Sequence, residues 1–484
     1  MTHASLILAA LLVPLVGAAL IAAAGRWPNL REGVTLSTAA LLLLCVLSLL
    51  PTVLAGERPA ASLIELLPGL AIAFRVEPLG MLFALIAAGL WIVNSIYSIG
   101  YMRANDEANQ TRFYVCFALA LGATMGIALA GNMFTLFAFY ELLTLVTYPL
   151  VTHAGTDDAR RGGRTYLGLL MGTSIMFLLP ALIITWAVAG TTDFTAGGIL
   201  ADRLDPLSLG GLLALYVFGL GKAAVMPFHR WLPAAMVAPT PVSALLHAVA
   251  VVKAGVFSVV KVVLYVFGIG TLSAAGGADW LVGIAGFTIV AASVVALGAR
   301  NLKRMLAYST VSQLSYIVMA TAVLAPLSVL GAVLHIAAHA LGKITLFFAA
   351  GAIYTAAHKT ELGELDGIGR RMPWTMTAFA IGALSMIGLP PAVGFLSKWY
   401  MLSGAMSVSH AFAVAVVVLS TLLNAGYFLP IVFRAFFRDA DGPSHGEAPL
   451  PMVVALTATA AGTVLLFFHI DVPLALARQL IPGG

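Results

Sequence analysis

Residues 207–230 read LSLGGLLALYVFGLGKAAVMPFHR, an apolar run long enough to cross a bilayer core of about 30 Å at about 1.5 Å per helical residue. The run contains a lysine, Lys222, and a proline, Pro227. A proline inside a span removes a backbone N–H and frees carbonyls, which is tolerated where the helix lines a hydrated cavity. The stretch therefore predicts an interrupted transmembrane helix that carries a charged side chain beside its break.

The rest of the chain has the same apolar character. Of its 484 residues, 61% are hydrophobic and 9% are charged, whereas roughly 25% of residues are charged in soluble proteins. Because a water-soluble globule cannot bury so much apolar surface, we expect an all-α, polytopic membrane protein with about fourteen transmembrane helices. The predicted spans are 4–25, 33–54, 77–102, 112–130, 133–153, 165–189, 207–230, 240–268, 279–298, 304–324, 327–357, 374–402, 411–436 and 449–470.

The basic residues predict the orientation of these spans. Sixteen Lys and Arg residues fall in odd-numbered predicted loops, whereas the even-numbered loops contain only Arg58, Arg75 and Arg203. Because cytoplasmic loops are enriched in Lys and Arg, we expect the odd-numbered loops in the cytoplasm. Both termini are then expected on the non-cytoplasmic side of a cell (inner) membrane.

The composition excludes several other functions. The net charge of +5 arises from basic residues scattered between apolar runs, which does not fit a nucleic-acid partner. Cys45 and Cys116 are isolated and too few for an iron–sulfur cluster, a four-ligand zinc site or a disulfide framework. Gly221-Lys222 lacks the remaining residues of a nucleotide-binding loop. We therefore expect no cofactor, metal or catalytic residue on this chain, and any redox chemistry on another polypeptide.

Few ionisable side chains remain inside the predicted spans. The four lysines near mid-span are Lys222, Lys253, Lys343 and Lys398. Side chains at that depth cannot easily reach the interface, and four together favour a functional role. Lys261 lies close to a helix end and is expected to be structural. Arginine, which cannot be deprotonated in proteins, is absent from the predicted interior, whereas a buried lysine can release a proton.

Histidines and one acidic residue complete a predicted proton path. His335, His339 and Lys343 follow an i, i+4, i+8 spacing, which places three protonatable groups on one helix face. His247 lies in the eighth predicted span. Glu141 is the only acid well inside a predicted span, so we expect it to pair with Lys222.

Two predicted spans carry helix breakers in matched positions. Pro227 and the following Pro239 and Pro241 mark the seventh span, and Pro390 and Pro391 interrupt the twelfth. Each break lies in the fourth helix of a five-helix unit. Because five is odd, the two units begin on opposite faces of the membrane. The sequence thus predicts inverted repeats of helices 4–8 and 9–13. The expected units are 1–111, the first repeat 112–268, the inverted repeat 279–436, and helix 14 with the tail, 437–484.

Several long motifs resemble those of the antiporter-like membrane subunits shared by Mrp-type Na+/H+ antiporters, respiratory complex I and membrane-bound hydrogenases. The motifs are GK at 221–222, PFHRWLP at 227–233, APTPVSALLH at 238–247, LKRMLAYSTVSQ at 302–313, GLPP at 388–391 and GFLSK at 394–398. Their order and the similarity of residues 80–436 make the resemblance specific. Ala234 departs from the family, in which most members have Asp or Asn there.

The resemblance implies roles for the buried ionisable residues. Glu141 matches the fifth-helix glutamate that pairs with the lysine of the seventh helix, here Lys222. The implied proton-translocating residues are Glu141, Lys222, His247, Lys253, His335, His339, Lys343 and Lys398. The implied partners are other membrane subunits of a hetero-oligomeric complex, protons, the lipid bilayer and, in an antiporter, Na+.

Three functions from different classes fit these features. The first is the proton-translocating subunit of a multisubunit Na+/proton antiporter, similar to its D or A subunits. The second is a proton-pumping subunit in the membrane arm of a complex I-like NADH:quinone oxidoreductase or a hydrogenase, with all cofactors on partner chains. The third, an autonomous solute transporter, is disfavoured by the long motifs.

Overall fold

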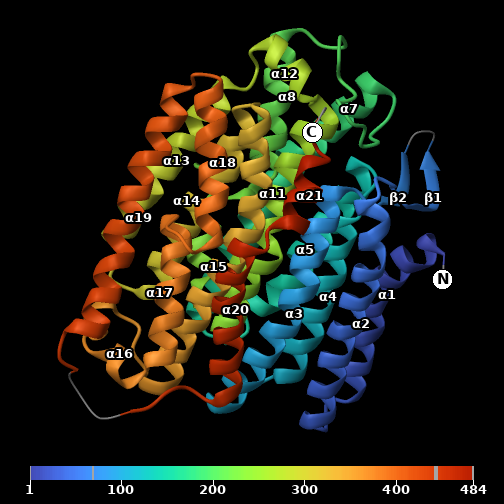
Figure 1. Ribbon diagram of the computed structural model, residues 1–484. Helices are drawn as coiled ribbons and strands as arrows, with labels where there is room; N and C mark the ends of the chain where they lie inside the picture. The colour runs from blue at the N-terminus through green and yellow to red at the C-terminus, as the bar shows by residue number, and fades with distance from the viewer. Residues whose placement is uncertain (1, 68–69, 441–444, 482–484) are drawn as a thin grey trace.

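The computed structural model describes residues 2–67, 70–440 and 445–481, most of which lie in helices (Figure 1). Eleven of the described helices are long and apolar enough to cross a membrane, and each coincides with a predicted span. The other predicted spans correspond to α14 and to two interrupted segments. The prediction of an all-α, multi-pass membrane protein is therefore confirmed.

The elements that form the spans are α1 His3–Ala23, α2 Pro28–Leu54, α3 Pro78–Ala104, α4 Gln110–Ala128, α5 Met133–Val151, α6 Asp157–Thr173 continued by η1 Ser174–Leu178 and α7 Leu179–Ala189, α8 Pro206–Gly219 with η2 Gly221–Ala223, α9 Trp231–Ala234 and η3 Ala235–Val237, α10 Thr240–Ala244 continued by η4 Leu245–Val249, α11 Val251–Val262 and η5 Val263–Phe267, α13 Asp279–Leu297, α14 Leu302–Ala322, α15 Pro326–Ala357, α17 Pro373–Ile387, α18 Val393–Ser407, α19 Ala411–Phe437 and α20 Leu450–Phe468. Shorter elements lie between or after them: β1 Ala60–Leu67, β2 Leu70–Arg75, α12 Ile269–Ala275, η6 Leu362–Glu364, α16 Ile368–Arg371 and α21 Asp471–Arg478.

The seventh span is interrupted where the sequence predicts it. α8 ends at Gly219, η2 forms one short 3-10 turn, and Pro227 lies in the non-helical stretch before α9. Pro239 and Pro241 do not interrupt this span, because Pro239 is the N-cap of α10 and Pro241 lies in its first turn. Proline is favourable there, since first-turn N–H groups have no helical partner. These two prolines therefore start the eighth span.

The twelfth span has the second break. α17 ends at Ile387, Pro390 and Pro391 lie in the connecting stretch, and α18 resumes the span at Val393. Because the helix stops in mid-span, the last carbonyls of α17 have no helical N–H partner. They remain available to side chains that approach the break.

Two helices form the centre of the bundle. The continuous segment from α10 to η5 is wholly buried, and α15 is buried along most of its length. α15 packs against α3, α14, α17, α18 and α20. These two central helices carry five of the eight candidate proton-translocating residues, so most of the candidate path lies where protein, not lipid, surrounds it.

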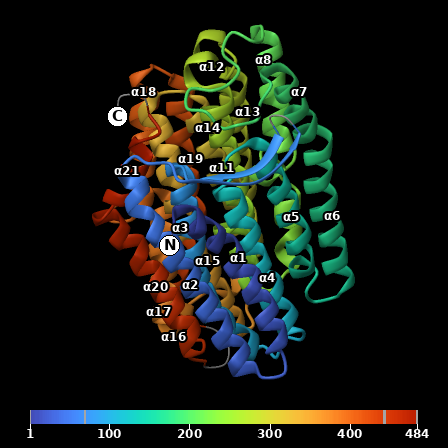
Figure 2. The ribbon, with the colours of Figure 1, turned by 90° about the vertical axis from the view of Figure 1, so that its right-hand side faces the viewer.

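The loops divide between the two ends of the bundle. The β1–β2 hairpin and α12 lie at one end and α16 lies at the other (Figure 1). The hairpin, which the apolar pattern does not predict, is antiparallel and is anchored to the start of α5 by a hydrogen bond of 3.0 Å from the Ala73 N–H to the Thr135 hydroxyl. α6 and α7 run along one edge of the bundle (Figure 2).

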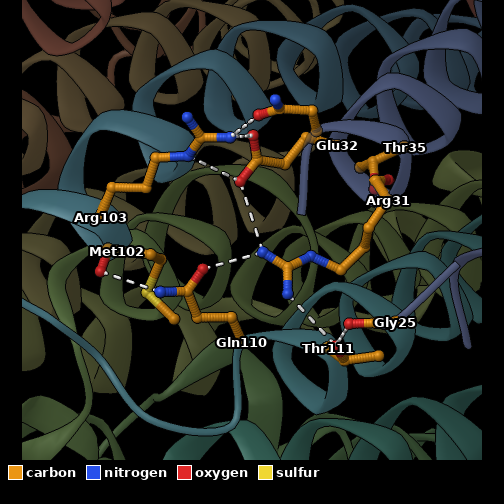
Figure 3. Close-up of polar contacts among 9 residues, drawn as sticks. Gly25, Arg31, Glu32, Thr35, Met102, Arg103, Gln110 and Thr111 are labelled. Carbon is orange, nitrogen blue, oxygen red and sulfur yellow. Dashed lines mark hydrogen bonds and ion pairs between the residues drawn. The ribbon is translucent and has the colours of Figure 1, made fainter. Parts of the chain in front are cut away.

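A buried charge cluster joins α2 to α3 and α4 (Figure 3). Arg31, expected in the first loop, lies in the first turn of α2 and is only 4% exposed. Its guanidinium donates to Gln110 Oε1 at 2.9 Å and to Thr111 Oγ1 at 3.2 Å. The Glu32 carboxylate accepts from Arg103 Nε at 3.1 Å and lies 3.4 Å from Arg31 Nη2. These hydrogen bonds and ion pairs offset the cost of burying the charged side chains at the ends of apolar helices.

Candidate proton-relay site

Lys222 lies in the first helix break and faces α5. Its Nζ donates to the Tyr140 carbonyl at 2.8 Å and to the Thr144 hydroxyl at 2.6 Å. The ammonium also lies 3.2 Å from the centre of the Tyr140 ring, and the Lys222 backbone N–H donates to the Tyr140 hydroxyl at 3.0 Å. Neutral oxygens and a ring face thus hold the lysine in a buried site.

Glu141 does not make the direct ion pair with Lys222 that the sequence predicts. No ion pair among the described residues includes Glu141, whose two carboxylate oxygens are buried. Glu141 directly follows Tyr140, whose carbonyl accepts from Lys222 Nζ. Tyr140 and Thr144, one residue before and three after Glu141, bind the Nζ of Lys222 in place of the carboxylate.

The two central helices meet at Lys253 and His339. Lys253 on α11 contacts Nδ1 of His339 on α15 through its Nζ, and both residues are fully buried. The other ring nitrogen of His339 has no partner among the described residues. The pair is therefore a direct junction between the eighth and eleventh spans.

His335 continues the path towards the second break. Its ring centre lies 6.1 Å from that of His339, one helical turn away. Nδ1 of His335 lies 2.8 Å from the Ser397 hydroxyl, and Nε2 lies 3.0 Å from Oε1 of Gln313. The amide nitrogen of Gln313 donates to the Met386 carbonyl at 3.2 Å. A histidine held on both nitrogens is fixed in orientation.

Lys398 belongs to α18, and its side chain reaches the broken end of α17. Its Nζ donates to the carbonyls of Met386 and Ile387 at 2.8 and 3.1 Å, and it lies 4.6 Å from the centre of the Tyr316 ring. The negative end of the α17 dipole thus stabilises the ammonium without a carboxylate. Both broken helices therefore place a lysine on backbone carbonyls and an aromatic ring.

His247 and Lys343 flank this path. His247 lies in η4, packs 4.7 Å from the centre of the Phe347 ring, and has no hydrogen-bond partner for either ring nitrogen among the described residues. Lys343 donates to the Leu306 carbonyl at 3.2 Å. Lys343 is one helical turn from His339 on α15, and His247 packs against Phe347, one further turn along the same helix. Local π-helical geometry such as η4 often occurs at functional sites.

Lys261 has a different environment. Its Nζ lies 3.0 Å from the Glu77 carboxylate and donates to the Ala130 carbonyl at 2.9 Å. Glu77, at the N-cap of α3, is 3% exposed and is thus a deeply buried acid, although it stands at the end of its predicted span. The ion pair ties α11 to α3, which fits the structural role expected for Lys261.

A glycine lets the first break approach the central helix. A Cβ on Gly255 would lie 2.2 Å from the Ala223 backbone nitrogen, so only glycine fits between α11 and η2.

Gly255→Val should push η2 away and lower the free energy of unfolding by about 1–3 kcal/mol. Thermal unfolding of the purified complex measures this, with Gly283→Val as control because Gly283 has open space around its Cβ position. Equal stability of the two variants would contradict the packing argument.

The structure brings most of the predicted residues together and adds several that sequence reasoning missed. A continuous set of contacts or short steps connects Lys253, His339, His335 and Lys398, whereas no described side-chain contact joins Lys222 to Lys253. The added residues are Tyr140, Thr144, Gln313, Tyr316 and Ser397. Polar residues within apolar spans are the signal that could have found Thr144, Gln313 and Ser397.

Chemically, the arrangement suits proton transfer. It offers imidazole, amine, amide and hydroxyl groups within or near hydrogen-bond reach in a buried row, where a proton can pass along alternating donors and acceptors. Groups of three or more His, Cys, Asp or Glu side chains positioned to hold a metal do not occur among the described residues.

Comparison with known proteins identifies similar chains. Residues 130–424 match the family described as "NADH:quinone oxidoreductase/Mrp antiporter, TM". NADH-quinone oxidoreductase subunit N of Desulforudis audaxviator is 33% identical over 386 residues, covering 78% of this chain and 75% of that protein. A probable K(+)/H(+) antiporter component of Rhizobium meliloti is 34% identical, covering 68% of this chain but 32% of that protein. A chain of the Mrp complex from a Dietzia species has the same fold, with a TM-score of 0.87, 21% identity, and coverage of 99% of this chain and 97% of that chain.

Proposed function

This chain belongs to the family of NADH:quinone oxidoreductase/Mrp antiporter membrane subunits, and we propose that it is the proton-translocating subunit of a multisubunit Na+/proton antiporter. The observation that carries the proposal is the buried row from Lys253 through His339 and His335 to Lys398. Each member can hold or release a proton, and in the described part of the chain none is paired with a carboxylate that would keep it charged.

The proposed mechanism moves protons without other chemistry. Lys222 and Glu141 act on each other electrostatically, and a charge or conformational change that alters their separation changes the affinity of Lys222 for a proton. A proton then passes between the first break and the central row, and leaves through the second break. Two inverted five-helix repeats, helices 4–8 and 9–13, provide the two halves of this path.

The proposed setting is a cell membrane with the odd-numbered loops in the cytoplasm and both termini outside. The partners are the other membrane subunits of the complex, protons, Na+ and lipid. No cofactor is assigned to this chain.

A second function rests on a specific observation. The chain spans three quarters of a quinone oxidoreductase subunit N but about a third of the similar antiporter component. A proton-pumping membrane-arm subunit of a complex I-like oxidoreductase or hydrogenase is therefore the alternative. Purification from native membranes separates the two: small membrane subunits alone support the antiporter, whereas co-purifying iron–sulfur or flavin subunits support the redox complex.

Proton flux through the purified complex tests the proposed relay. In proteoliposomes with an internal pH-sensitive dye, Glu141→Gln should lower the flux about tenfold, because the amide cannot change the charge beside Lys222. Asp157→Asn is the control, since Asp157 is exposed at the start of α6. Equal flux in wild type and Glu141→Gln would remove Glu141 from the mechanism, and absence of flux in wild type would overturn the proposed function.

A further inference from the structure

A cavity lined by both polar and apolar side chains lies at the end of the bundle where α10 begins. Its volume is about 340 Å³, and its lining includes Tyr101, Glu107, Thr240, Lys303, Tyr354 and Lys359. The loop segments that contribute follow α3, α5, α9, α13 and α15, and all of them are odd-numbered loops by the sequence count. The cavity therefore lies on the face of the bundle that carries most of the basic loop residues, and it is called the mouth below.

Glu107 is the carboxylate of this cavity. It lies in the loop between α3 and α4, half-buried, and one of its oxygens is 3.8 Å from Nε2 of His153. Burial raises the pKa of Glu107, and the charge of Lys303 on α14 opposes this rise. Lys359, after α15, lines the same cavity. A carboxyl in such a place can bind and release protons closer to neutral pH than an exposed glutamate.

The inner wall of the cavity leads to the relay. α10 starts at the cavity with Thr240 and continues into η4, so His247 lies seven residues further along, about 10 Å at about 1.5 Å per residue. On the facing α3, the side-chain amide of Asn94 donates to the Pro241 carbonyl at 3.4 Å. Asn94 Oδ1 and both ring nitrogens of His247 are buried and unpartnered among the described residues. Buried polar atoms without a protein partner are where ordered water binds in proteins, which favours a hydrated path from Thr240 to His247.

Lys303 forms part of the wall of the cavity and contacts the start of α10. Its Nζ donates to the Ala238 carbonyl at 2.6 Å, just before the N-cap of α10. The contact joins the start of α14 to the start of α10. Glu107 therefore faces a fixed wall that contains a cation, and its proton occupancy is coupled electrostatically to that cation.

We propose that this cavity is the proton mouth of the chain on its odd-loop face and that Glu107 is the group that exchanges protons between the aqueous phase and His247. The inference rests on the proposed function and assigns an entry site to it. A proton from water forms an O–H bond with the Glu107 carboxylate. That O–H bond breaks as the proton passes along the Thr240 and Asn94 wall, and an N–H bond forms at a ring nitrogen of His247.

Substitutions at Glu107 in the reconstituted complex test its role. Glu107→Gln should lower proton flux about tenfold, and Glu107→Asp, which keeps the carboxylate, should restore most of it. Asp106→Asn is the matched control, since Asp106 is its exposed neighbour and does not line the cavity. A purely structural role for Glu107 predicts the opposite ranking, with the isosteric glutamine tolerated and the shorter aspartate impaired, and that result would overturn the proposal.

Thiol labelling tests the mouth independently of Glu107. With Cys45 and Cys116 replaced by alanine, Met236→Cys should react with a membrane-impermeant methanethiosulfonate added to the odd-loop face, and labelling should block flux. Wild-type flux with an unreactive Met236→Cys, or with labelling that leaves flux intact, would overturn the mouth while the proposed function stands. Absence of flux in wild type would instead overturn the proposed function, whatever the labelling result.

Discussion

Replacing Lys253 with methionine is expected to lower proton flux by about a hundredfold while the complex still assembles. Lys253 is the residue through which α11 contacts His339 on α15, so the two central helices lose their direct proton-transfer contact. Methionine is similar in length and apolar, and it suits a buried position with no acidic partner. The measurement is the rate of dye acidification in proteoliposomes that contain equal amounts of complex.

A buried lysine on the same helix supplies the control. Lys261 lies two turns from Lys253 and pairs with Glu77, outside the relay. The double variant Lys261→Met with Glu77→Gln removes both charges together and should keep wild-type flux. Retention of flux in Lys253→Met, or its equal loss in the double variant, would show that flux does not depend on the Lys253–His339 contact.

Lys261→Met alone is expected to lower the free energy of unfolding by about 3–5 kcal/mol. The substitution leaves the Glu77 carboxylate buried without its cation, 3.0 Å from where Nζ was. An uncompensated buried charge is far more costly than the loss of a surface pair. Unfolding of the purified complex with increasing denaturant, followed by circular dichroism, measures the change.

Restoring charge balance should restore stability. The double variant Lys261→Met with Glu77→Gln keeps no uncompensated charge, so most of the lost stability should return. A double variant that is less stable than Lys261→Met would contradict the assignment of this pair as the cause. If the double variant regains stability, the two lysines of α11 differ as expected, one affecting transport and the other affecting stability.

Much of the fold could be predicted from local sequence because lipid imposes simple rules. Apolar runs of sufficient length must be helical, since backbone groups have no other partner in the bilayer core. Because proline has no backbone N–H to donate within a helix, the breaks at Pro227 and Pro390 could be predicted from the sequence. The β1–β2 hairpin could not be predicted from the sequence, because its residues lie in a loop where neither lipid nor a core requires a periodic apolar pattern.

The partners of the buried charges could not be predicted in the same way. Glu141 was expected to pair with Lys222 because it is the only acid well inside a predicted span, yet Tyr140 and Thr144 hold the Nζ of Lys222. Gln313 and Ser397 orient His335 although neither can carry charge. Which side chain reaches which atom depends on helix rotation and depth, and these result from packing against several helices at once.

The sequence by itself determined that this chain crosses the membrane many times, where two of its helices break, and that His335, His339 and Lys343 share one face of a helix. These properties follow from hydropathy, proline chemistry and helical periodicity, which act over a few turns. Only the tertiary structure decided that Lys253 contacts His339, that the side chain of Lys398 reaches the end of α17, and that Lys261 is neutralised by Glu77. Those contacts join residues far apart in the chain, so they exist only after the helices have packed.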